Sequence, residues 1–98
     1  MKTIISDLNK AFDNRVRLGI MAILSVNDSV DFNQLKDLLD ITDGNLASHL
    51  KALEGNKLIM VYKQFVGRKP NTSYAITARG KKQFQQHLDA LEQLIKPL

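Results

Sequence analysis

The most constraining feature of this sequence is a change of hydrophobic period at Gly55 and Asn56. Before these residues, apolar side chains recur at helical spacing. After them, Leu58–Val66 is rich in β-branched and aromatic residues, as in a strand. Thr72–Ile76 resumes the extended pattern, and Gly67–Asn71 between the two strands is predicted to form a loop. A helical half that leads into a β-hairpin is therefore expected.

Capping residues and apolar spacing predict five helices, so the fold class is mainly α with a small β-hairpin (α+β). The first two helices are expected at Ile4–Phe12 and Arg15–Val26, and a brief strand follows at Val30–Phe32. Asn33 is expected to cap a third helix, because its side-chain oxygen can accept from free amides of the first turn. The side chains of this helix that are expected to face inward are Leu35, Leu38 and Leu39.

The fourth predicted helix follows the third across a tight link. Thr42 is expected to cap it, and the apolar pattern ends near Glu54 or Gly55. Thr77 is expected to cap a last helix that reaches about Lys96. The order of elements is thus two short helices across a turn, a hairpin, and a long closing helix.

The fourth predicted helix has one leucine face and one face of small or polar residues. With the leucines inward, the outward residues are Gly44, Asn45, Ala47, Ser48, Lys51 and Ala52. Short side chains let a helix approach the major groove, while Asn, Ser and Lys reach base edges and phosphates. Gly44 costs about 1 kcal/mol of helix propensity in a helix interior, which close approach to a sugar-phosphate backbone would justify. A plain amphipathic helix with a solvated face is the alternative.

Positive charge is concentrated in one part of the chain. Residues 51–82 contain eight Lys or Arg and one Glu, a net charge of +7, whereas the other residues carry −3. This segregation is typical of a polyanion-binding face, and a solvated basic surface is the alternative. The hairpin contributes Arg68 and Lys69. A helix-turn-helix followed by a basic hairpin places one element in the major groove of duplex DNA and the other against the backbone or minor groove.

Two segments, Asp40–Leu53 and Val66–Gly80, resemble the recognition helix and the wing of MarR-like and ArsR-like winged helix-turn-helix regulators. The likeness covers about Asp13–Phe84. It implies a sequence-specific transcriptional regulator that binds double-stranded DNA, a palindromic operator, as a homodimer. The DNA contacts that it implies are Gly44, Asn45, Ala47, Ser48 and Lys51 on the recognition helix and Arg68, Lys69 and Asn71 on the wing. One departure is Lys57, where such regulators often have Gly, so the left-handed residue is expected at Gly55 or Asn56.

Both ends of the chain carry apolar residues that a winged core does not need. We interpret residues 1–98 as a single domain in which residues 1–12 and 78–98 are dimerisation helices that flank a core of residues 13–77. The apolar positions of the last helix are spaced by four, three and four residues, as in a coiled coil. The predicted two-fold interface consists of Ile5, Leu8, Phe12, Phe84, Leu88, Leu91 and Ile95. Half-sites on DNA are then expected roughly 34 Å, or a small multiple of it, apart.

Two histidines and three aromatic residues need separate interpretations. His49 borders the inward face and is interpreted as half-buried with one hydrogen bond, rather than as a pH sensor or phosphate contact. His87, Asp89 and Glu92 share one helix, but no spacing brings three ligands together, so ordinary surface residues are favoured over a metal site. Sheet and core packing, rather than stacking on unpaired bases, is the interpretation for Tyr62, Phe65 and Tyr74.

Several classes of function are disfavoured by what the sequence lacks. The chain contains no Cys, which excludes disulfides, thiolate zinc sites and thiol nucleophiles and fits a reducing cytoplasm. No apolar run is long enough to span a membrane. Because no nucleophile motif or phosphate-binding loop is present, neither an enzyme nor a cofactor is expected, and no polar constellation marks an effector site. The alternative function is a winged-helix protein-interaction module that does not bind DNA.

Overall fold

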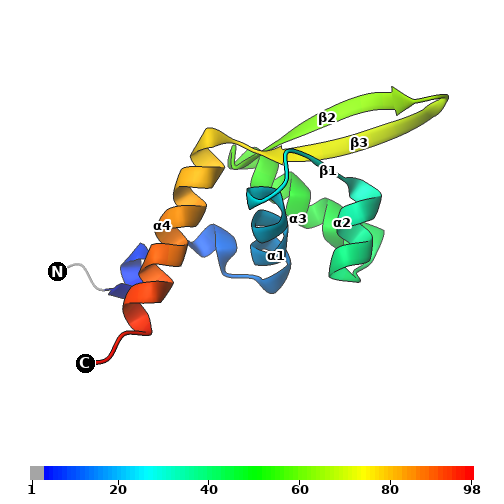
Figure 1. The fold of residues 1–98 in the computed structure, drawn as a ribbon. Coiled ribbons are helices and arrows are strands. Elements are labelled where there is room, and N and C mark those ends of the chain that lie inside the picture. The colour runs from blue at the N-terminus through cyan, green and yellow to red at the C-terminus, as the bar shows by residue number, and fades with distance from the viewer. Residues whose placement is uncertain (1–3) are drawn as a thin grey trace.

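The computed structural model describes residues 4–98 and shows helices below one face of a small antiparallel sheet (Figure 1). Within this range, the N-terminal 3₁₀ turns are η1 (Ile4–Asp7) and η2 (Lys10–Phe12). The α-helices are α1 (Arg15–Ser25), α2 (Phe32–Leu39), α3 (Asp43–Gly55) and α4 (Ala78–Leu94). The strands are β1 (Val30–Asp31), β2 (Ile59–Val66) and β3 (Lys69–Ile76). The mainly helical α+β class is confirmed, and so is the predicted order of elements from Arg15 onward.

Side-chain caps determine where most helices begin. The Asn14 side chain accepts from the amides of Val16 and Arg17, and Thr42 and Thr77 cap α3 and α4, as predicted. The predicted cap of α2 is wrong, because Asp31 caps this helix two residues before Asn33. Asp31 accepts from the Gln34 amide at 2.8 Å, and the Gln34 side chain accepts from the Asp31 amide at 3.0 Å. This reciprocal capping box ends β1 one residue earlier than expected.

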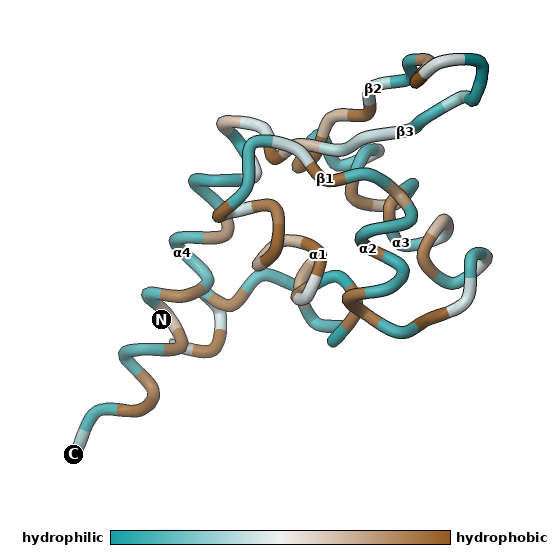
Figure 2. Tube along the Cα trace, turned by 45° about the vertical axis from the view of Figure 1, so that its right-hand side comes forward, coloured by the Kyte–Doolittle hydropathy of each residue, from teal (hydrophilic) through white to brown (hydrophobic). Residues whose placement is uncertain are grey.

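The core lies where α1, α2 and α3 meet beneath the sheet. α1 contributes Ile20, Met21 and Leu24, which are fully buried, and the predicted inward leucines of α3 are buried as well. Leu35 of α2 is buried, but the prediction for Leu38 is wrong: its side chain is 66% exposed. α2 is only two turns long, so its narrow apolar face has room for few inward side chains. Figure 2 shows hydrophobic segments along α1, and a hairpin end at which hydrophobic residues of β2 adjoin a hydrophilic turn.

The sheet has the strand order β1-β3-β2, and β2 and β3 form a hairpin that we call the wing. Eight antiparallel residue pairs, from Ile59–Ile76 to Val66–Lys69, extend it away from the helices (Figure 1). The predicted loop of residues 67–71 is wrong, because only Gly67 and Arg68 lie in the turn and β3 already begins at Lys69. Gly67 has φ +66°, as the first central residue of a two-residue II′ turn requires.

The N-terminal segment differs from the predicted single helix of residues 4–12. It forms η1 and η2, and the Asn9 side chain caps the second turn by accepting from the Ala11 amide. η1 packs on α4, and we call η1, η2 and α4 together the arm. The Phe12 and Phe84 rings meet edge to face at 5.6 Å and are both buried within the same subunit. The arm therefore adds its own aromatic contact to the core.

A close joint connects the end of α3, the base of the wing and the start of α4. Lys57, not Gly55 or Asn56, takes the left-handed conformation with φ +59°. The Lys57 amide donates to the Glu54 carbonyl and the Leu58 amide to the Leu53 carbonyl, which is a Schellman helix end. The Thr77 hydroxyl donates to the Lys57 carbonyl at 2.7 Å and accepts from the Gly80 amide at 2.9 Å.

The molecule is elongated, with principal extents of 57 × 25 × 21 Å. The wing ends at one extremity and the C-terminal end of α4 at the other, with the helical core between them (Figure 1). The two projecting parts leave the core in opposite directions.

Candidate nucleic-acid interface

Helix α3 presents the predicted small and polar residues to solvent. Because its leucines are buried in the core, the opposite face is exposed at Gly44, Asn45, Ala47, Ser48 and Lys51. No described atom lies within 4 Å of a Cβ built on Gly44. Packing within this chain therefore does not require a glycine at this position. Close approach of another molecule to the α3 backbone would require one.

Two polar contacts orient α3 relative to the other helices. Asp40 ends α2 in the left-handed conformation with φ 52°, and the Lys36 ammonium lies 2.8 Å from the Asp43 carboxylate at the start of α3. The hydrogen bond and charge of Asp43 raise the pKa of Lys36. Since both side chains are exposed, this ion pair contributes little stability, and the buried leucines hold most of the angle between α2 and α3.

The second contact joins α1 and α3. Arg17 donates from Nε to Nδ1 of His49 at 3.0 Å, and His49 is half-buried, so its predicted single hydrogen bond is confirmed. Burial and the neighbouring Arg17 guanidinium lower the pKa of His49, which is therefore neutral at pH 7. A neutral imidazole can accept the arginine proton, whereas an imidazolium cannot. His49 thus orients α3 against α1 and does not add charge to the exposed face of α3.

A groove of about 450 Å³ separates α3 from the wing. Its lining residues are Phe32, Ala47, Leu50, Lys51, Glu54, Val61, Lys63, Thr72 and Tyr74. The groove brings Lys63 of β2 beside the predicted DNA contacts Ala47 and Lys51. The sequence interpretation missed Lys63, although the period of two from Ile59 through Val61 would have placed it on the same sheet face as these core residues.

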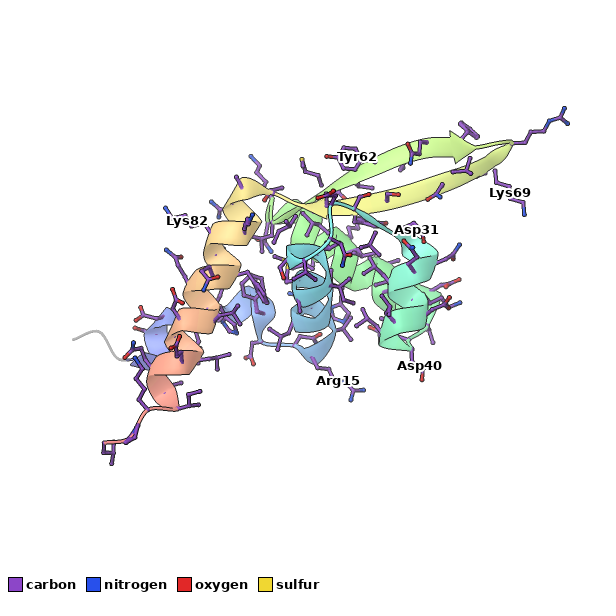
Figure 3. The ribbon with its side chains drawn as sticks, in the orientation of Figure 1. Arg15, Asp31, Asp40, Tyr62, Lys69 and Lys82 are labelled. Atoms are coloured by element: carbon purple, nitrogen blue, oxygen red, sulfur yellow. The ribbon has the colours of Figure 1, made fainter. Side chains whose placement is uncertain are left out.

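The end of the wing carries exposed positive charge. Arg68 occupies the turn and Lys69 begins β3, and both are exposed, whereas Asn71 is half-buried. Figure 3 shows Lys69 at the far end of the hairpin. Neither Arg68 nor Lys69 has a carboxylate within salt-bridge distance among residues 4–98. Their charges are therefore free to attract an anion from outside the chain.

The positive segment of residues 51–82 does not form one continuous face. Lys82 lies on α4, on the other side of the core from Lys69 (Figure 3). Arg79 and Lys81 belong to the same exposed first turns of α4. The sequence segregation thus overestimates the charge beside α3, where Lys51, Lys63 and the wing tip supply it.

The three hairpin aromatics have different environments. Tyr74 is buried, as predicted, and burial together with the charge of Glu54 raises its pKa. The prediction of core packing is wrong for the other two side chains, because Tyr62 is 46% exposed and Phe65 is 74% exposed. Figure 3 shows Tyr62 on the sheet face that points away from the helices. Strand alternation therefore assigns Phe65 to the face of Val61 and Lys63, beyond the residues that line the groove.

The prediction that His87 is an ordinary surface residue is wrong. His87 is 7% exposed, accepts from the Asn9 amide through Nδ1 at 3.0 Å, and packs on Phe12. Burial lowers the pKa of His87, while the charge of Asp13 acts in the opposite direction. Over the described range, no three His, Asp or Glu side chains are grouped to bind a metal ion. No helix in that range has the length and apolar character of a membrane span.

Comparison with known proteins adds three findings. Residues 16–95 match the family model described as a winged helix DNA-binding domain. An uncharacterized protein of Methanocaldococcus jannaschii is 36% identical over 87 residues, which cover 89% of this chain and 95% of that protein. The structure of a transcriptional regulator homologue from Pyrococcus horikoshii is similar with a TM-score of 0.83 and 36% identity, covering 94% of this chain and 89% of the other.

A more distant structure has the same fold. The S. aureus MepR–DNA complex matches with a TM-score of 0.73 and 16% identity, covering 87% of this chain and 73% of that chain. At this identity the likeness extends to the arrangement of helices and sheet.

Proposed function

Because this chain belongs to the winged helix DNA-binding domain family, we propose that it is a sequence-specific transcriptional regulator that binds double-stranded DNA as a homodimer. α3 enters the major groove, and the wing lies on the backbone or in the minor groove. The observation that carries this proposal is the exposed, weakly polar face of α3 beside a groove and wing with unpaired positive charge. The family is described as a DNA-binding domain, and the similar structure is that of a transcriptional regulator homologue. This role is not enzymatic.

The residues of α3 have two separate roles in this proposal. Gly44 and Ala47 keep the helix surface low, so that the backbone can approach the groove. Asn45 and Ser48 read base edges, because amide and hydroxyl groups donate and accept hydrogen bonds in the patterns that base pairs present there. Lys51 contacts phosphate.

The wing makes the flanking contacts. Arg68 and Lys69 neutralise phosphates, and Asn71 hydrogen-bonds to the backbone. These groups fix the position of the protein on the duplex without selecting a sequence. Sequence preference is then carried by α3 and affinity largely by the charged side chains.

The arm forms the proposed two-fold interface. Leu88 and Leu91 are 40% and 37% exposed, and Ile5 and Ile95 are exposed as well, so a partner subunit would cover apolar surface here. Phe12 and Phe84 are buried in their own subunit, where their rings pack on each other beneath the exposed apolar residues. Residues 1–12 and 78–98 then act as dimerisation segments around the winged core of residues 13–77. A two-fold dimer presents its two α3 helices to half-sites roughly 34 Å, or a small multiple of it, apart on a palindromic operator.

Salt dependence of duplex binding tests the charged contacts. Each phosphate contact contributes about 0.9 to the slope of log K against log salt, so Lys51→Ala and Arg68→Ala should each flatten the slope by about that amount. Lys82→Ala is the matched control, because this exposed lysine lies on the far side of the core. Fluorescence anisotropy with labelled duplex across a salt series measures the slopes. Equal slopes for all four proteins would contradict the assignment.

Selection from a random duplex pool separates this proposal from its alternative. Ser48→Ala and Asn45→Ala should change the selected sequence more than the salt slope. If the chain is instead a protein-interaction module, the wild type will retain no random duplex even at low salt.

A further inference from the structure

The geometry points to an apolar contact at the end of the wing: we propose that Phe65, supported by Pro70, inserts into the minor groove and partly unstacks a base step. This inference rests on the proposed function, because it concerns how the wing meets duplex DNA. It assigns the wing a shape-reading role in addition to its phosphate contacts.

The position of Phe65 follows from strand register. Alternate residues of β2 share one face of the sheet, so Phe65 lies on the same face as Val61 and Lys63. Lys63 lines the groove beside Lys51 of α3. Phe65 therefore lies two residues further out along the surface that already faces the proposed DNA contacts.

The packing of Phe65 leaves its ring available. Phe65 is 74% exposed, and its partner across the hairpin is Pro70. A cross-strand pair of a ring and a proline makes a stiff apolar tip, because Pro70 has a fixed φ and Phe has two side-chain torsions. Phe is commonly buried in folded proteins, whereas Phe65 keeps three-quarters of its surface open to a partner from outside the chain.

The charges around this ring favour DNA as its occupant. Arg68 and Lys69 follow Phe65 around the turn, and Lys63 precedes it on the same face. An apolar protein partner would have to desolvate these cations, whereas the walls of the minor groove pair them with phosphates. Proteins that bind the minor groove use Phe and Pro as wedges between base steps, and flexible pyrimidine–purine steps unstack most readily.

The matched control is on the neighbouring residue. Val66 is 60% exposed and adjacent to Phe65, and strand alternation turns its side chain to the other side of β2, where it borders a hollow shared with Phe32 and Asn33 of α2. Phe65→Ala and Val66→Ala thus remove similar exposed apolar groups from the two sides of β2. Because neither side chain is part of the core, both variants should keep the wild-type melting temperature.

The probe is an alternating dA-dT duplex with a single 2-aminopurine, whose fluorescence rises when the base unstacks. Wild type and Val66→Ala should raise the fluorescence and bind equally. Phe65→Ala should bind about tenfold more weakly, give no fluorescence rise, and keep the wild-type salt slope, because it removes no charge. Phe65→Leu should restore part of the binding.

Two results would overturn the inference. If wild type binds the duplex and Phe65→Ala binds equally well, the wedge is wrong while the proposed function stands. If Phe65→Ala and Val66→Ala lose binding equally, DNA affinity depends on the total exposed apolar area of the wing and not on the position of Phe65, and the wedge is wrong. A wild type that retains no duplex at low salt contradicts the proposed function itself, and the wedge with it.

Discussion

The wing and the arm extend from the same core in opposite directions and differ at their ends: the wing end combines cations with the exposed ring of Phe65, whereas the outer part of α4 exposes leucines. The wing ends in Arg68 and Lys69, and its strands gain stability from pairing with each other. The arm exposes Leu88 and Leu91 along α4, on the same helix face whose Phe84 and His87 are buried against Phe12. An elongated molecule can thus keep an attraction for polyanions and an attraction for apolar surfaces far apart.

This separation has a physical advantage. If the two surfaces were adjacent, a protein partner that covers the leucines would have to strip water from the lysines and arginines, which is costly. With the core between them, each surface can be covered without desolvating the other. Three measurements test whether the two ends are joined through the core, whether the apolar end associates, and whether the arm or α3 responds to acid.

The largest effect is expected at the joint between the two ends. A Cβ on Gly80 would lie 2.0 Å from the Leu58 carbonyl oxygen, a backbone atom at the base of the wing. Gly80→Ala should therefore lower the free energy of unfolding by about 3 kcal/mol, measured by urea denaturation. Gly44→Ala is the control: it meets no described atom within 4 Å and should leave stability equal or slightly higher. Wild-type stability for Gly80→Ala would mean that the two ends are not tightly coupled there.

The next effect tests the apolar end. Leu91→Glu should weaken self-association by at least about a hundredfold, because a two-fold interface places the lost apolar contact and the new charge in both subunits. Light scattering coupled to size exclusion measures the mass. Gln86→Glu adds the same charge at another exposed position of α4 and should leave the mass unchanged. A monomeric wild type would break the comparison, since the apolar end would then have no partner copy to bind.

The smallest effect is a loss of stability in mild acid. Burial lowers the pKa of both His87 and His49, with Asp13 opposing the shift at His87 and Arg17 reinforcing it at His49. Below the unfolded value of about 6.5, the unfolded chain binds more protons than the folded chain, so the free energy of unfolding falls as pH falls. The fall ends once pH drops below the folded pKa values.

Thermal melts between about pH 7.5 and 5 in wild type, His87→Gln and His49→Gln assign this loss to the arm or to α3. Because His87 is the more buried of the two, its variant should lose more of the pH dependence. If both variants keep the full dependence, other groups cause it.

Much of the fold was predictable because local chemistry determines it. Asn14, Thr42 and Thr77 cap helices as their side chains suggest, and the resemblance to winged-helix transcriptional regulators is confirmed by the family match and the similar structure. The ArsR-like part of the resemblance stays a prediction. The predicted face of α3 is exposed as expected, because its leucines have a clear helical period.

The errors arose where competing local choices were close in energy. Asp31 and Asn33 are both good caps, and the reciprocal bond with Gln34 decides for Asp31. Lys57 takes the left-handed conformation although Asn56 tolerates it better, because the carbonyl of Lys57 is held by Thr77, twenty residues away. Long-range contacts of this kind, like the burial of His87 against Asn9, leave no periodic signal in the sequence.

The hydroxyl of Thr77 serves two elements at once. It caps α4 by accepting from the Gly80 amide, and it donates to the carbonyl of Lys57, which follows α3. Because both hydrogen bonds share one oxygen atom, a movement of the start of α4 would strain the contact that follows α3. In the proposed homodimer, a change in how the two α4 helices meet would therefore reach the two α3 helices through Thr77.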